Sequence, residues 1–147
     1  MEECFAMTTP QQPIRVLLAD DDPIFVELAS SALCGIGCTV EAAVDGAVAF
    51  HLLLQQEFDV ALVDLSMPHV DGFRLIGMIR ATARLRRLPI MVLTVRDDPE
   101  SVEEARRLGA DSYTTKPVNW SRFRPQMQAI VAAYRGEAGA RAAAAVR

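Results

Sequence analysis

Five short apolar segments are spaced along the chain and alternate with stretches whose apolar residues recur at helical spacing. The apolar segments are Ile14–Ala19, Thr39–Val44, Val60–Val63, Ile90–Leu93 and Tyr113–Thr115. Strands that alternate with helices predict an α/β domain built around a parallel sheet. Most of these segments are continuous runs of Val, Leu and Ile, which favours strands covered by helices on both faces.

The starts of four predicted helices are marked by aspartates, whose side chains can cap the first turn. Two of these aspartates precede a proline, the residue favoured at the first helical position. The four are Asp22, Asp45, Asp71 and Asp98. The first helix carries an apolar stripe that begins at Phe25. We therefore expect helices to begin directly after these four positions.

The last two predicted helices differ in their apolar faces. The fourth has a thin stripe, made of Val102, Ala105 and Leu108, which is consistent with a weakly anchored, movable element. The fifth has a nearly continuous stripe between Trp120 and Tyr134. Pro125 lies within it and leaves two outcomes open, a late start of the helix or a bend.

The chain divides into three parts. With 147 residues and 51% hydrophobic content it can bury one hydrophobic core. We expect a loose N-terminal arm over residues 1–13 and one domain over residues 14–135. Residues 136–147 form an Ala-rich tail or linker that either continues as helix or frays.

Charge and hydropathy exclude several classes of protein. The net charge of −4 and the absence of a dense Lys/Arg stretch argue against direct binding of nucleic acid. The N-terminus is acidic, unlike a secretory signal. No window approaches the roughly 18 apolar residues of a membrane span. We expect a cytoplasmic protein without a membrane partner.

Distinctive polar residues follow four of the five predicted strands. Asp20 and Asp21 follow the first strand, Asp64 the third, Thr94 the fourth and Lys116 the fifth. Ligands of open parallel sheets bind beyond the carboxyl ends of the strands, at the point where the strand order reverses. We therefore expect these side chains to meet at one edge of the sheet.

The residue types at this edge suit phosphoryl transfer. Crowded carboxylates repel one another unless a cation joins them, and hard oxygen ligands favour Mg²⁺ over softer metals. A carboxylate can also act as a nucleophile toward a phosphoryl group. Such a transfer needs charge neutralisation and positioning, which Mg²⁺, a lysine ammonium and a hydroxyl supply.

Four segments of the sequence resemble the receiver domains of bacterial two-component response regulators. They are VLLADDDP (Val16–Pro23), LVDLSMPHVDGF (Leu62–Phe73), IMVLT (Ile90–Thr94) and YTTKP (Tyr113–Pro117). The resemblance extends from about Ile14 to Tyr134. It implies a flavodoxin-like, doubly wound, five-stranded parallel sheet of order 2-1-3-4-5 with five helices.

The resemblance assigns the acidic residues to a phosphorylation site. It implies that Asp64 is the phosphoacceptor and that Asp20 and Asp21 hold Mg²⁺. Asp21 would be the direct ligand and Asp20 would act through water. The backbone carbonyl of Ser66 would be a further ligand, together with Asp64 itself.

The remaining matches concern the response to phosphorylation. Thr94 matches the hydroxyl residue that contacts the phosphoryl group, and Lys116 matches the invariant lysine. The Lys116–Pro117 peptide bond is expected to be cis. Tyr113 matches the aromatic switch residue that turns inward when the threonine moves.

These matches predict a signalling switch rather than an enzyme. A sensor histidine kinase or phosphotransfer protein would donate the phosphoryl group to Asp64, and only self-catalysed phosphotransfer and autodephosphorylation would follow. The face made by the fourth helix, fifth strand and fifth helix would then change shape and contact a partner or a second copy in a homodimer. An output domain, absent from this chain, would follow it unless the receiver stands alone.

Two alternatives remain open at this stage. The chain could be a pseudo-receiver, an unphosphorylated interaction module. Val95, at a position where the family usually has a very small residue, points weakly that way, and Val118 replaces a common aromatic. The other alternative, a phosphatase acting through an aspartyl-phosphate, is disfavoured because Ser66 occupies the place of its second aspartate.

Overall fold

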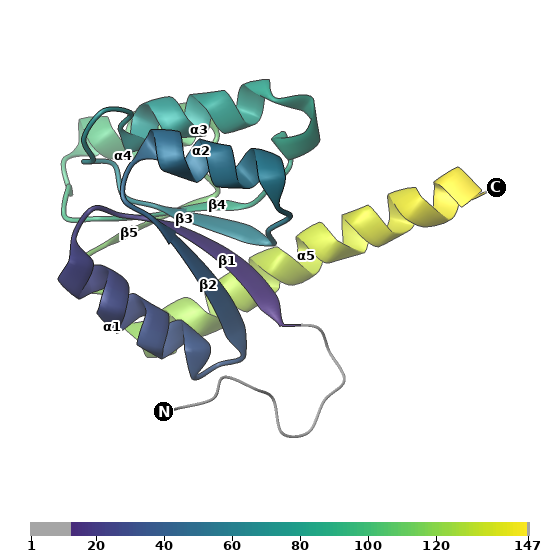
Figure 1. Cartoon of the computed structure of the whole chain (residues 1–147), viewed down its shortest axis with the longest axis horizontal. Coiled ribbons are helices and arrows are strands. Elements are labelled where there is room, and N and C mark those ends of the chain that lie inside the picture. Colours follow the sequence, from purple (N-terminus) through teal and green to yellow (C-terminus); the bar gives the residue numbers. More distant parts are fainter. Residues whose placement is uncertain (1–12, 147) are drawn as a thin grey trace.

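The structure, a computed structural model, describes residues 13–146 and their side chains as far as residue 136. Its centre is a five-stranded parallel sheet with the order β2-β1-β3-β4-β5, as predicted (Figure 1). The predicted arm lies almost wholly outside the described residues. The strands are β1 (Ile14–Ala19), β2 (Cys38–Ala43), β3 (Val60–Val63), β4 (Ile90–Thr94) and β5 (Ser112–Thr115).

Within the described residues, five α-helices cover the two faces of the sheet. Figure 1 shows α2, α3 and α4 on one face and α1 and α5 on the other. The prediction of a doubly wound α/β fold is thereby confirmed, and one short 3₁₀ helix, η1 (Ala83–Leu85), was not predicted. The helices are α1 (Pro23–Cys34), α2 (Gly46–Gln55), α3 (Gly72–Ala81), α4 (Pro99–Leu108) and α5 (Trp120–Val146).

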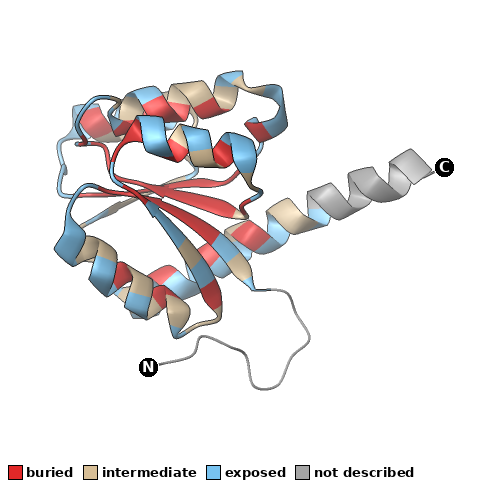
Figure 2. Ribbon diagram, viewed as in Figure 1, coloured by how far each residue is buried: buried red, intermediate tan, exposed pale blue. Residues whose placement is uncertain are grey.

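Two hydrophobic cores lie on opposite sides of the sheet. Along β1, Val16 and Leu18 lie in the core beneath α1 and α5, whereas Leu17 and Ala19 lie in the core beneath α2, α3 and α4. This division follows from the two-residue period of a strand. Figure 2 shows the central strands buried along most of their length. The strands are thus held from both faces, and their ends are fixed in space.

All four predicted aspartate caps are present. Each carboxylate accepts a hydrogen bond from a backbone N–H in the first turn of its helix, at 2.9–3.0 Å. The donors are the N–H groups of Ile24, Val48, Arg74 and Ser101. The caps satisfy donors that the helix itself leaves without partners.

The helix α5 begins before Pro125 rather than after it. Its first turn starts at Trp120, where the Asn119 side chain accepts a hydrogen bond from the Arg122 N–H at 3.3 Å. The helix continues to Val146, well past the sheet (Figure 1). Of the two outcomes predicted for the Ala-rich tail, the structure therefore shows a continued helix. The limits assigned to the domain remain a prediction.

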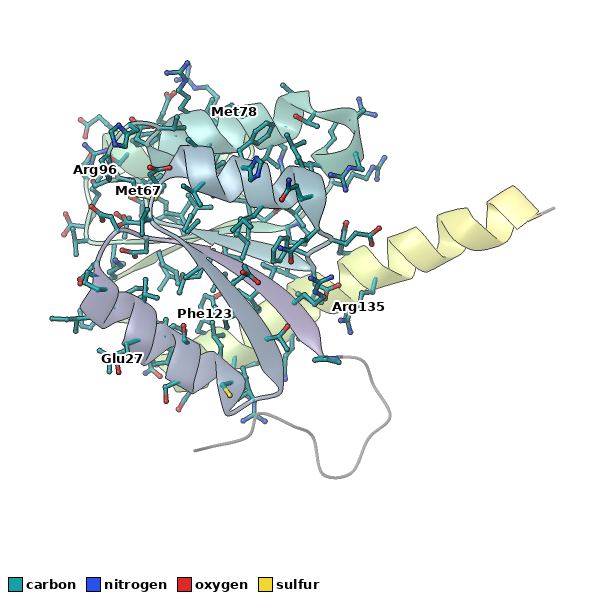
Figure 3. The ribbon with its side chains drawn as sticks, in the orientation of Figure 1. Glu27, Met67, Met78, Arg96, Phe123 and Arg135 are labelled. Atoms are coloured by element: carbon teal, nitrogen blue, oxygen red, sulfur yellow. The ribbon has the colours of Figure 1, made fainter. Side chains whose placement is uncertain are left out.

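An ion pair fastens α5 where the helix leaves the sheet. The Arg135 guanidinium donates to both carboxylate oxygens of Asp59, at 3.1 and 2.9 Å, and to the carbonyl oxygen of Pro13 at 3.0 Å. Figure 3 labels Arg135 at this end of the molecule, with Arg96 and Met67 at the opposite end. Because Asp59 immediately precedes β3, the helix is attached directly to the central strands.

A close approach of two backbones fixes the loop between β3 and α3. The Gly72 N–H donates to the carbonyl oxygen of Leu65 at 3.0 Å. A Cβ atom at Gly72 would overlap the carbonyl oxygen of Asp64 and lie 2.6 Å from the Cα atom of Leu65. Glycine is required here for space, and the loop after β3 is held in one place.

Replacement of this glycine has a predictable cost. We expect Gly72→Ala to lower the free energy of unfolding by about 1–3 kcal/mol, because backbone must shift to admit the methyl group. The control is Gly77→Ala in the same helix, where nothing lies within 4 Å of the added carbon. That change should stabilise the protein by about 0.4–1 kcal/mol. Urea unfolding of both variants measures the difference, and equal effects would contradict the packing argument.

Candidate functional site

The polar residues predicted from the sequence lie at the carboxyl ends of the strands. Asp20 follows β1, Asp64 follows β3, Thr94 ends β4 and Lys116 follows β5. Backbone hydrogen bonds continue the sheet to this edge: the Asp64 N–H donates to the Ala19 carbonyl at 2.9 Å and the Lys116 N–H to the Thr94 carbonyl at 2.8 Å. The positions of these residues are therefore set mainly by the pairing of the strands rather than by the conformation of the loops.

Three carboxylates form one cluster. Oxygen atoms of Asp20, Asp21 and Asp64 all lie within 4.8 Å of one another. Asp20 is 2% exposed and Asp64 is 7% exposed, whereas Asp21 is open to solvent. Two of the three acids are therefore almost removed from water, while the third provides an accessible side to the cluster.

The Lys116 ammonium enters this cluster from β5. Its Nζ atom lies 2.6 Å from Asp20 Oδ2 and 3.5 Å from Asp64 Oδ2. The same atom lies 3.9 Å from the centre of the Phe25 ring on α1. The Lys116–Pro117 peptide bond is cis. From the loop after β5, the lysine thus contacts both buried acids, which follow the neighbouring strands β1 and β3.

The charge balance of the cluster suits a divalent cation. Burial raises the pKa of Asp20, which outweighs the lowering effect of its hydrogen bond from Lys116. With all groups ionised, three carboxylates and one ammonium (three minus one) leave two uncompensated negative charges. Carboxylate oxygens with an open side are suitable donors for Mg²⁺, which keeps several waters when bound. The residues present fit that ion.

The backbone of Arg96 connects Thr94 and Tyr113. Thr94, fully buried, accepts a hydrogen bond at Oγ1 from the Arg96 N–H at 3.4 Å. The half-buried Tyr113 donates its hydroxyl proton to the Arg96 carbonyl at 2.8 Å. The Arg96 guanidinium lies over the Phe73 ring of α3, 5.4 Å from its centre. The loop after β4 is therefore tied to the threonine, the tyrosine and α3.

Ser66 and Val95 occupy exposed positions near this edge. The Ser66 N–H donates to Asp64 Oδ1 at 3.3 Å, which places this loop against the acid. Its carbonyl as a metal ligand stays a prediction. Val95 is 69% exposed, so its methyl groups lie largely in solvent rather than within the buried acids.

Sequence reasoning did not identify Phe25 as part of the site. Its spacing indicated only the apolar stripe of the first helix, whereas its ring lies against the Lys116 ammonium. The ring also stacks on Trp120 of α5, with centres 6.3 Å apart. An aromatic residue in the turn after Asp22 was visible in the sequence, but nothing local indicated which side chain it would face.

Comparison with known proteins agrees with this arrangement. Residues 16–128 match the family model described as response regulator receiver domain. The transcriptional regulatory protein RprY of Bacteroides fragilis (strain YCH46) is 31% identical over 131 residues, 89% of this chain and 55% of that protein. The chain spans about half the length, or less, of the first curated relatives that it matches.

Solved structures show the same fold. A putative response regulator from Chloroflexus aurantiacus J-10-fl is 28% identical, with a TM-score of 0.78 over 82% of this chain and 98% of that one. The receiver domain of sensor histidine kinase PA1611 from Pseudomonas aeruginosa PAO1 is 27% identical, with a TM-score of 0.77 over the same shares. That structure has a magnesium ion coordinated in its active-site cleft.

The family model covers most of the chain, including Asp20, Asp64, Thr94 and Lys116. Among residues 13–146, no helix is both long and apolar enough to cross a membrane. Sequence, fold and strand-end chemistry all agree: the chain belongs to the response regulator receiver domain family.

Proposed function

We propose that Asp64 accepts a phosphoryl group from the phosphohistidine of a sensor histidine kinase or phosphotransfer protein. The observation that carries this proposal is the position of the Lys116 ammonium between Asp20 and Asp64, inside a cluster of three carboxylates. A carboxylate can act as the nucleophile toward a phosphoryl group, and the lysine ammonium lies beside the Asp64 carboxylate. The same charge can neutralise an incoming phosphoryl group.

The metal would be held at the open side of the cluster. Asp21 and Asp64 would bind Mg²⁺ directly, Asp20 would bind it through water, and the Ser66 carbonyl would be a further ligand. When bound, the ion supplies charge neutralisation for the transferring group. The fit rests on the donor set and its residual charge of about −2, and a similar fold with Mg²⁺ in its cleft supports it.

The chain's own residues would carry out the transfer as follows. An Asp64 carboxylate oxygen attacks phosphorus, a new P–O bond forms and the P–N bond to the donor histidine breaks. The imidazole leaves with the bonding electrons and takes up a proton. Lys116 stabilises charge on the phosphoryl oxygens, and the Thr94 hydroxyl donates to one of them. The reaction changes Asp64 itself and turns over no separate substrate, so we do not propose an enzyme.

The signal would spread through the loop after β4. If Thr94 moves toward the phosphoryl group, its hydroxyl leaves the Arg96 N–H, and the Arg96 carbonyl can then release the Tyr113 hydroxyl. Both bonds involve the backbone of one residue, so the threonine and the tyrosine are coupled. Tyr113 would then turn inward, and the α4-β5-α5 face would change. A switch of this kind requires two packings separated by only a few kcal/mol.

The helix α4 is suited to such a movement. Only Ser101 and Ala105 of this helix are buried. Its outer face carries two exposed ion pairs, Glu103–Arg106 and Glu104–Arg107. Such pairs contribute little to anchoring. We propose this face as the surface that contacts a partner or a second copy of the chain.

We also propose an output domain, a cellular location and a linker for this receiver. RprY is about twice as long as its matched segment and is named a transcriptional regulatory protein, so we propose that a longer form of this protein carries an output domain. We place the receiver, residues 14–135, in the cytoplasm, without direct contact to nucleic acid or membrane. The extension of α5 beyond residue 135 would be the linker.

The pseudo-receiver alternative loses its main structural argument. It rested on Val95, whose side chain is largely exposed rather than packed over the acids. The same experiment that tests the phosphoacceptor also separates these two functions.

We predict that incubation with Mg²⁺ and acetyl phosphate adds one phosphoryl mass increment to the chain. Asp64→Asn should abolish it, because an amide oxygen is a poor nucleophile. Intact-mass spectrometry measures the product. Asp59→Asn, at the opposite end of β3, is the control and should still be phosphorylated. An unmodified wild-type chain would favour the pseudo-receiver, and an increment that persists in Asp64→Asn would contradict the assignment of the acceptor.

A second prediction concerns the metal. We expect Asp21→Asn to raise the Mg²⁺ concentration needed for half-maximal phosphorylation by about tenfold or more, because a direct ligand loses its charge. Asp22→Asn removes the same charge from the neighbouring residue while asparagine retains the helix cap. It should shift the Mg²⁺ requirement little. Equal shifts in both variants would indicate a general field effect instead of ligation at Asp21.

A further inference from the structure

We propose that Phe25 is a positioning residue for Lys116, and that its ring face holds the ammonium where phosphoryl transfer to Asp64 needs it. This inference rests on the proposed function and adds to it a residue outside the acid, hydroxyl and lysine set. It concerns a contact between α1 and the loop after β5, two segments far apart in the sequence.

The ammonium is enclosed by three groups. Asp20 and Asp64 accept from it at 2.6 and 3.5 Å, and the Phe25 ring centre lies 3.9 Å away. The lysine side chain is only 11% exposed. A cation this close to a ring face is attracted by the ring's electron-rich surface, and more strongly where water is excluded.

The contact matters because lysine is flexible. Its charge sits on a stem with four rotatable bonds, so a single carboxylate partner does not define its position. The bond to Asp20 is the shorter of the two and draws the ammonium away from Asp64. The contact with the Phe25 ring adds a partner that is not a carboxylate and limits the positions that the ammonium can adopt beside the two acids. Preorganised charge of this kind lowers the barrier to transfer because it needs no rearrangement.

The ring of Phe25 is itself held by aromatic neighbours. Its ring stacks on Trp120 with an interplanar angle of 29°, and Trp120 meets Phe123 edge-on with centres 5.4 Å apart. Figure 3 labels Phe123 on α5, below the sheet and close to α1. Val118, in the loop itself, is aliphatic. The aromatic surface beside the lysine loop is thus supplied by α1 and by the first turn of α5.

The test compares two replacements of the ring. Phe25→Leu keeps a large apolar side chain and removes the ring face, whereas Phe25→Tyr keeps the face. With acetyl phosphate and saturating Mg²⁺, we expect Phe25→Leu to slow formation of phosphorylated Asp64 about five- to tenfold, and Phe25→Tyr to stay within about twofold of wild type. Thermal unfolding confirms that each variant is folded under the assay conditions.

A double-mutant cycle shows whether Phe25 acts through the lysine. Lys116→Met removes the ammonium and keeps an unbranched side chain. In that background, Phe25→Leu should change the slow residual rate by less than about twofold, because the group that the ring positions is gone. A merely structural role for Phe25 would lower both rates by the same factor.

A measurement without any reaction checks the contact itself. The ring current of Phe25 should shift the ε-methylene protons of Lys116 upfield in the NMR spectrum of the metal-free protein. The shift should persist in Phe25→Tyr and disappear in Phe25→Leu.

The inference is overturned if Phe25→Leu reacts as fast as wild type, if both ring variants are equally slow, if the double-mutant cycle shows no coupling, or if the upfield shift is absent. These failures are distinct from failure of the proposed function, in which the wild-type chain itself would not be phosphorylated.

Discussion

The buried ammonium of Lys116, between the carboxylates of Asp20 and Asp64, is the interaction on which the arrangement of the site depends. Two carboxylates that are almost inaccessible to water would be strongly unfavourable together without a cation. The lysine comes from a segment 96 residues away from Asp20 and 52 residues away from Asp64. It reaches them only when β1, β3, β4 and β5 are all in register, so the site is complete only in the folded sheet.

The doubly wound fold supplies that register. Apolar residues of β1, β3 and β4 pack into two cores, one on each face, and the strand ends are thereby fixed on a common edge. The polar residues that directly follow the strands are therefore placed along this edge. The loop after β3 is further held by the approach of Gly72 to the backbone of Asp64 and Leu65. Asp64, the proposed acceptor, thus sits on a rigid support, while Asp21 remains open to solvent.

The strand ends that carry the acids are held rigidly, whereas α4 is attached more loosely to the rest of the domain. The loop after β4 is held by hydrogen bonds of Arg96 to Thr94 and Tyr113, and α4 itself buries two residues. The helix α5, by contrast, is fastened at both ends of its contact with the sheet, by aromatic packing around Trp120 and by the Arg135–Asp59 pair. Under the proposed function, phosphorylation of Asp64 would therefore move α4 more easily than α5.

The sequence by itself determined the elements of this fold and the chemistry of its edge. Apolar runs, aspartate caps and the polar residues after the strands are local signals, and they predicted the five strands, the five helices and the acids, hydroxyl and lysine of the site. Tertiary structure alone decided that Phe25 faces Lys116 and that the lysine lies closer to Asp20 than to Asp64. It also decided that Arg135 pairs with Asp59. These contacts join residues whose local sequence carries no information about each other, because side-chain partners across elements are chosen by packing in three dimensions.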